Sequence, residues 1–126
     1  MKYLIDTNVL LYAAANVQEA VSFFDDAVKA EWVGYSAITR LEALGFPALK
    51  HEDERKLTAM LECFEEVSAG REVIDRAVAI RRGRKIRVPD AIIAGTALVM
   101  KATLVTRNAS DFKGIPGLSI LNPFAR

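Results

Sequence analysis

Short apolar segments alternate with segments of helical periodicity along the whole chain, and this alternation restricts its fold most strongly. Strands are expected at residues 2–5, 32–35, 64–67, 103–106 and 118–121. Helices are expected at about residues 7–15, 17–30, 36–44, 52–64, 70–82 and 89–101, with a single turn at 109–112. Strands that alternate with helices predict an α/β fold with a central, mainly parallel sheet flanked by helices.

The totals fit one small domain that spans residues 1–126. The 17 basic and 16 acidic residues give a net charge of +1, so overall charge offers no argument for nucleic-acid binding. The single cysteine, Cys63, excludes an intrachain disulfide and a cysteine-based zinc site, and its apolar helical surroundings predict a core position.

The apolar segments are too short for a membrane protein. The longest, at about residues 91–100, cannot span a bilayer, and the N-terminal apolar run ends at Asp6, too early for a signal peptide. We therefore expect a soluble protein with no membrane contact, located in the cytoplasm.

Asp6 stands between an apolar strand and an apolar helix, in LIDTNVLLY. An aspartate at this point can simply cap the helix. In open α/β sheets, however, binding sites form beyond the carboxyl ends of the strands, and Asp6 is at one such end.

Glu42 has no basic neighbour one helical turn away, because those positions hold Ile38, Thr39, Gly45 and Phe46. It shares a helical stripe with Ile38 and Phe46, which predicts that it faces the interior. Buried acids are usually paired or bound to metal. The alternative is that the stripe is misread by one position and that Glu42 is solvated.

Two further acids stand at the ends of elements. Asp90 opens the most apolar helix, and Asp111 follows the strand at 103–106. Each has a local explanation, as a partner of the helix dipole or in a capping arrangement with Asn108. Four acids gathered at one sheet edge would destabilise one another, and a divalent cation relieves this; ligation by oxygen alone suits Mg²⁺ or Mn²⁺.

The segments LIDTN, SAITRLEAL, VPDAIIAGTAL and LVTRNASDF follow one another in an order that resembles the PIN domain. More narrowly, the chain resembles the VapC toxins of bacterial and archaeal toxin–antitoxin pairs, over essentially its whole length. The resemblance implies a PIN-like fold, a metal-dependent endoribonuclease that acts on an RNA substrate, a homodimer and an antitoxin partner.

The acidic quartet of the family falls, by position, on Asp6, Glu42, Asp90 and Asp111. The resemblance implies that Asp6 and Asp90 are the principal ligands of Mg²⁺ or Mn²⁺ and that the other two complete the site, through ordered water or a second ion. The supporting polar positions of the family fall on Asn8, Thr106 and Asn108.

A basic segment, IRRGRKIRV, precedes Asp90 and contains Arg81, Arg82, Arg84, Lys85 and Arg87. These side chains, together with Arg40, could contact RNA phosphates or antitoxin carboxylates. The alternative is that cations near a helix C-terminus complement its dipole, which explains Arg81 and Arg82 better than the other three.

Two other functions fit parts of the sequence. A catalytically silent PIN scaffold would bind RNA or a protein without cutting. A phosphatase of the haloacid-dehalogenase type also has an aspartate after its first strand, but it expects a second one where Asn8 stands. The only histidine, His51, lies in a polar stretch, and nothing favours a Ser-His-Asp triad.

Overall fold

The computed structural model describes residues 1–125, and its elements follow the predicted alternation. The strands are β1 (Lys2–Ile5), β2 (Trp32–Ser36), β3 (Glu65–Val67), β4 (Thr103–Val105) and β5 (Ile120–Leu121). The helices are α1 (Thr7–Ala14), α2 (Gln18–Ala27), α3 (Ala37–Leu44), α4 (His51–Cys63), α5 (Arg71–Gly83), α6 (Val88–Met100) and α7 (Ala109–Phe112).

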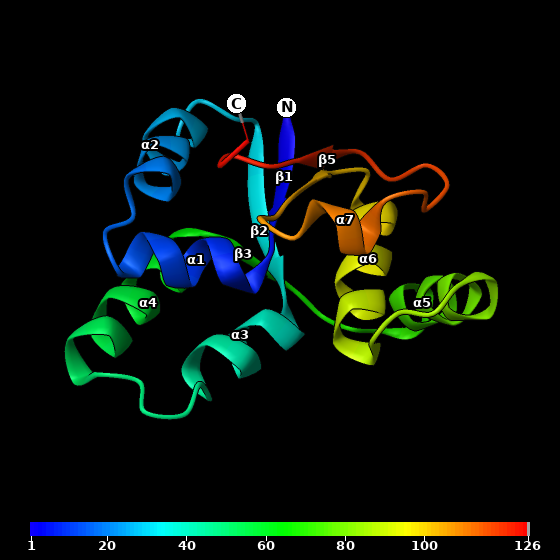
Figure 1. Cartoon of the computed structure of the whole chain (residues 1–126), viewed down its shortest axis with the longest axis horizontal. Helices are drawn as coiled ribbons and strands as arrows, with labels where there is room; N and C mark the ends of the chain where they lie inside the picture. Colours follow the sequence, from blue (N-terminus) through cyan, green and yellow to red (C-terminus); the bar gives the residue numbers. More distant parts are fainter. Residues whose placement is uncertain (126) are drawn as a thin grey trace.

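The five strands form one sheet in the order β3-β2-β1-β4-β5, and every neighbouring pair is parallel. At its centre, Leu4 of β1 is in register with Gly34 of β2 and Leu104 of β4. The predicted α/β fold with a parallel sheet is therefore confirmed. Because the strands are parallel, their carboxyl ends share one edge, where α1 and α3 begin (Figure 1).

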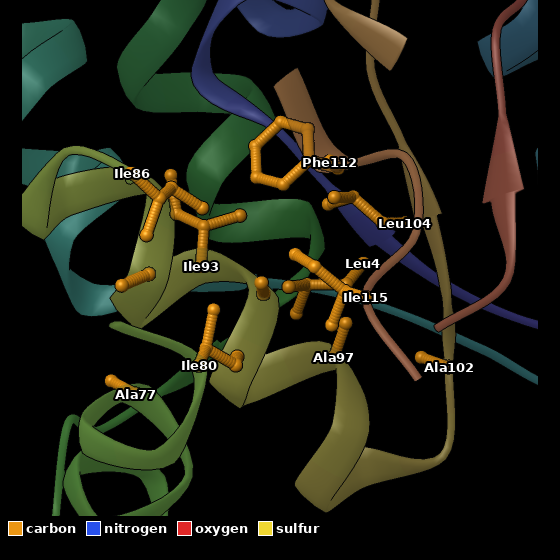
Figure 2. Close-up of a cluster of buried hydrophobic side chains, with 12 residues drawn as sticks. Leu4, Ala77, Ile80, Ile86, Ile93, Ala97, Ala102, Leu104, Phe112 and Ile115 are labelled. Atoms are coloured by element: carbon orange, nitrogen blue, oxygen red, sulfur yellow. The ribbon is translucent and has the colours of Figure 1, made fainter. Parts of the chain in front are cut away.

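Adjacent residues of the central strands point to opposite faces of the sheet and build two separate cores. Leu4 and Leu104 belong to the core that α5 and α6 cover, and Figure 2 shows them with Phe112 beside Ile93 of α6. The next residue of each strand belongs to the other core, under α1 and α4. The sheet is thus covered on both faces, as a parallel sheet requires.

Helix α6 is buried over most of its surface, as its apolar composition predicts. It packs closely on α5 at Gly95, where an added Cβ would lie 2.9 Å from the carbonyl oxygen of Val73. This close packing fixes the direction of α6 and therefore the position of Asp90 in its first turn.

The predicted core position of Cys63 and the predicted end of α2 are both wrong. Cys63 is exposed, because the buried residues of α4 are Leu57 and Leu61, and a residue two positions after Leu61 lies about 200° round the helix. Helix α2 ends at Ala27 rather than near residue 30, since the chain turns there towards β2, and Val28 is exposed.

The stripe predicted on α3 is also misplaced by one position. The buried residues of α3 are Thr39 and Ala43, whereas Phe46 is 52% exposed. Glu42 is half-buried beside this face rather than fully interior. Within residues 1–125, the helices are all too short or too polar to cross a membrane.

Candidate functional site

Asp6 directly follows β1 and is buried, with 5% of its surface exposed. Its Oδ1 accepts a hydrogen bond from the backbone N–H of Thr7 at 2.8 Å and so caps α1. Its Oδ2 accepts from Thr106 Oγ1 at 2.7 Å and from Asn8 Nδ2 at 3.3 Å. Asp6 is therefore both a helix cap and an anchored carboxylate at the sheet edge.

Burial raises the pKa of Asp6 from 3.8 to about 6. The hydrogen bonds from Thr106 and Thr7 oppose this shift, and the negative charges of Asp90 and Glu42 add to it. A carboxylate with a raised pKa is costly to ionise, so a cation bound beside it would be favoured.

Asp6, Glu42 and Asp90 line one cavity of about 340 Å³ at the carboxyl ends of the strands. Each comes from a different element, since Asp6 follows β1, Glu42 lies on α3 and Asp90 opens α6. Glu42 Oε1 accepts from Thr7 Oγ1 at 2.8 Å, and Asp90 Oδ2 accepts from Arg87 Nε at 3.3 Å. The structure thus brings three of the four predicted acids together.

The fourth acid, Asp111, is exposed on α7 and lines an adjoining cavity of about 330 Å³. The two cavities share Asp90 and Arg87. The hydrogen bond to Asp90 raises the pKa of Arg87, and the charges of Asp90, Glu42 and Asp111 raise it further. Asp111 is therefore electrostatically linked to the other acids through Arg87, although it lies outside their cavity.

The predicted supporting residues surround Asp6. Besides its contact with Asp6, Asn8 Oδ1 accepts from the backbone N–H of Arg107 at 3.1 Å. The backbone N–H of Asn108 donates to Thr106 Oγ1 at 3.0 Å, and Asn108 lines the cavity. The segment after β4 is thereby tied to the carboxylate after β1.

Sequence reasoning missed two buried threonines of the site. The hydroxyl of Thr7 contacts both Glu42 and the hydroxyl of Thr39, the latter at 3.1 Å. The only signal in the sequence was the position of Thr7 next to Asp6. For Thr39, the signal was its place on the same face of α3 as Ala43, which the predicted stripe did not include.

The predicted cationic contacts divide into two groups. Arg84, Lys85 and Arg87 line the adjoining cavity together with Ser110. The others turn elsewhere or stay in solvent: Arg40 pairs with Glu66 at 2.6 Å, Arg81 Nε donates to the carbonyl of Ile86 at 3.2 Å, and Arg82 is exposed.

The acidic cavity fits a hard divalent cation, because such ions prefer oxygen ligands and the cavity offers three carboxylates. One of these carboxylates, that of Asp6, is buried. Residues 1–125 contain no ready-made group of three or more histidine, cysteine or acidic side chains that could hold a metal ion. Arg87 provides the cationic partner of Asp90. A metal ion that uses Asp90 would compete with this contact.

The PIN domain family matches residues 3–118 of the chain. A chain of a toxin–antitoxin complex from Klebsiella pneumoniae is 31% identical with a TM-score of 0.83, over 98% of this chain and 99% of that one. VapBC2 from Rickettsia felis, bound to a promoter DNA fragment, gives 26% identity and a TM-score of 0.83, over 97% and 98%. FitAcB from Neisseria gonorrhoeae gives 27% identity and a TM-score of 0.77, over 98% and 99%.

Among curated proteins, no sequence matches the chain significantly. The family match covers all four predicted acids, most of β1 and the whole of β2, β3 and β4, and the resemblance read from the sequence is thereby confirmed. The chain belongs to the PIN domain family.

Proposed function

We propose that this chain is a metal-dependent endoribonuclease and the toxin of a type II toxin–antitoxin pair. The observation that carries the proposal is the cavity lined by Asp6, Glu42 and Asp90, in a chain of the PIN domain family. The similar structure from Klebsiella pneumoniae is a toxin–antitoxin complex, which supports an antitoxin as partner.

In this proposal, Asp6 and Asp90 hold Mg²⁺ or Mn²⁺, and Glu42 and Asp111 complete the site. When bound, the cation supplies a water of lowered pKa and stabilises negative charge during phosphodiester hydrolysis. Thr106 and the backbone of Thr7 orient the Asp6 carboxylate.

Other polar groups of the site orient Glu42 or contact the RNA substrate. The Thr7 hydroxyl orients Glu42, while Asn8 and Asn108 present amide groups to the cavity. The cations of the adjoining cavity, Arg84, Lys85 and Arg87, contact RNA phosphates and offset the repulsion between RNA and the acids.

The protein acts in the cytoplasm as a homodimer and is neutralised by its antitoxin. The loop after α3 exposes Phe46 and Pro47 at the rim of the acidic cavity, which supports this rim as part of a protein contact.

The test is cleavage of a structured RNA pool by antitoxin-free protein, with Mg²⁺ or Mn²⁺ and with EDTA. We expect metal-dependent cutting that falls by at least about 100-fold in Asp6→Asn and Asp90→Asn, because each removes a ligand charge. Asp75→Asn, at an exposed position of α5, is the matched control and should cut normally. Cutting that survives EDTA, or that both site variants retain, would contradict the proposal.

The second candidate is a catalytically silent PIN domain that binds RNA or a protein. The contact between Arg87 and Asp90 favours it, because a protein cation already neutralises one predicted metal ligand. Calorimetric titration with Mn²⁺ separates the two, since a silent scaffold would give no heat that depends on Asp6. The family match removes the basis of the phosphatase alternative.

A further inference from the structure

Arg107 is an exposed cation whose side chain and backbone are both restrained. Its Cζ lies 4.7 Å from the ring centroid of Tyr12 and 4.6 Å from that of Phe124. These two rings contact each other edge to face, with their centroids 5.2 Å apart. The backbone N–H of Arg107 donates to Asn8, and its carbonyl accepts from Asn122 Nδ2 at 3.3 Å.

The position of Arg107 connects it to the acidic cavity. It stands between Thr106, whose hydroxyl donates to Asp6, and Asn108, which lines the cavity. Tyr12, on which its guanidinium rests, follows Asn8 by one turn of α1. The guanidinium therefore lies over α1, one helical turn from the residue whose side chain contacts Asp6.

The hydrogen-bond donors of this guanidinium are available. None of the acidic side chains in residues 1–125 forms an ion pair with Arg107. Arg107 Cζ lies over both aromatic rings, and the N–H groups of a guanidinium form a planar fork that can bind an anion in bidentate fashion. Because the rings already restrain the side chain, little further conformational entropy is lost when it binds.

We propose that Arg107 binds a backbone phosphate of the RNA substrate, next to the phosphodiester that enters the acidic cavity. This inference rests on the proposed function and adds a contact on a new side of the site. Arg84, Lys85 and Arg87 lie in the segment between α5 and α6 and line a cavity with Ser110 and Asp111 of α7. From the end of β1, α1 extends in the direction opposite to α6 and α7 (Figure 1). Cations on both sides of the acids would hold a single strand across the cavity.

The test measures the affinity of the full chain for a fluorescein-labelled single-stranded RNA of mixed sequence, by fluorescence anisotropy in EDTA at roughly 50 to 200 mM salt. Arg107→Gln should weaken binding by about 5- to 20-fold at the lowest salt, and the slope of log K against log salt should fall by about 0.7, the value for one phosphate on a single strand. Arg107→Lys, which keeps the charge without the planar fork, should lie between the wild type and Arg107→Gln.

Lys101→Gln is the control, because it removes the same charge at the end of α6 opposite to Asp90. Its RNA affinity should equal that of the wild type. Equal losses in Lys101→Gln and Arg107→Gln would reduce the effect to overall charge and overturn the inference. A lower thermal midpoint of Arg107→Gln with unchanged RNA affinity would show that Arg107 only stabilises the fold through Tyr12 and Phe124. That result would also overturn the inference.

Two further outcomes separate this inference from the proposed function. If the wild type cuts RNA and Arg107→Gln cuts and binds it equally well, the inference fails and the endoribonuclease proposal stands. If the wild type neither binds nor cuts any RNA, both fail. Weaker antitoxin binding by Arg107→Gln with unchanged RNA affinity would assign the guanidinium to the protein partner and overturn the RNA contact.

Discussion

Asp6 combines a structural position, as a helix cap, with the proposed position of a metal ligand. A residue needed only as a helix cap could be serine or asparagine, which satisfy the same backbone N–H without charge. Here the capping residue is ionisable and buried, and its pKa is raised to about 6. Since the charge costs stability and the cap does not need it, the buried carboxylate supports the cation site that we propose.

Thr7 allows a test of how Glu42 is held. Thr7→Val keeps the shape of the side chain but removes the hydroxyl that donates to Glu42. We expect the free energy of unfolding to fall by about 1–2 kcal/mol, because a half-buried carboxylate loses a partner. RNA cleavage should fall by more than this loss of stability explains.

Thr7→Ser is the matched control, since it retains the hydroxyl and should keep most of the activity. Urea denaturation and cleavage assays of both variants check the prediction. Equal activity of the valine and serine variants would show that the hydroxyl does not position Glu42.

At the scale of elements, the burial of a helix was easiest to predict where the helix is surrounded by protein on nearly all sides. Helix α6 is apolar nearly all round, so its burial did not depend on choosing a face. Helix α3 carries apolar residues on several sides, and one of them, Leu41, is 68% exposed. Periodicity alone could not decide which side of α3 faces the sheet, and the predicted stripe was therefore displaced by one position.

The packing of α5 on α6 gives a prediction at this scale. Gly95→Ala should lower the free energy of unfolding by about 1–3 kcal/mol, because its Cβ would meet the backbone of Val73 and Ala77 at 2.9 and 3.2 Å. The gain in helix propensity, about 1 kcal/mol, should not offset this clash. Gly83→Ala, with open space around its Cβ in α5, should be neutral or slightly stabilising. Thermal and urea denaturation measure both, and a stabilised Gly95→Ala would contradict the close packing.

At the scale of the whole molecule, the parallel sheet explains which parts of the site were predictable. Asp6, α3 and α7 follow β1, β2 and β4, which are neighbours in the sheet, so strand ends alone bring their side chains to one edge. Asp90 follows no strand. Its position depends on how α6 packs against α5, and its contact with Arg87 depends on side-chain conformation, and neither can be read from spacing.

Without metal, the stability of the whole fold should depend on the charge of Asp6. Because the pKa of Asp6 is about 6 in the folded state and 3.8 ordinarily, the folded chain binds more protons between about pH 4 and 6. The contribution of Asp6 to the free energy of unfolding should therefore fall as the pH rises through this window. In EDTA at about pH 8, Asp6→Asn should be more stable than the wild type by about 1–3 kcal/mol, and this difference should vanish near pH 4.

Urea denaturation followed by circular dichroism at both pH values measures this difference. Mg²⁺ at about pH 8 should stabilise the wild type and leave Asp6→Asn unchanged, because only a ligand that binds the folded state shifts the equilibrium. A wild type more stable than the variant in EDTA would mean that the hydrogen bonds from Thr106 and Thr7 outweigh the burial of the charge. Equal stabilisation of both proteins by Mg²⁺ would place the cation elsewhere, and Asp6 would then serve the fold as a cap alone.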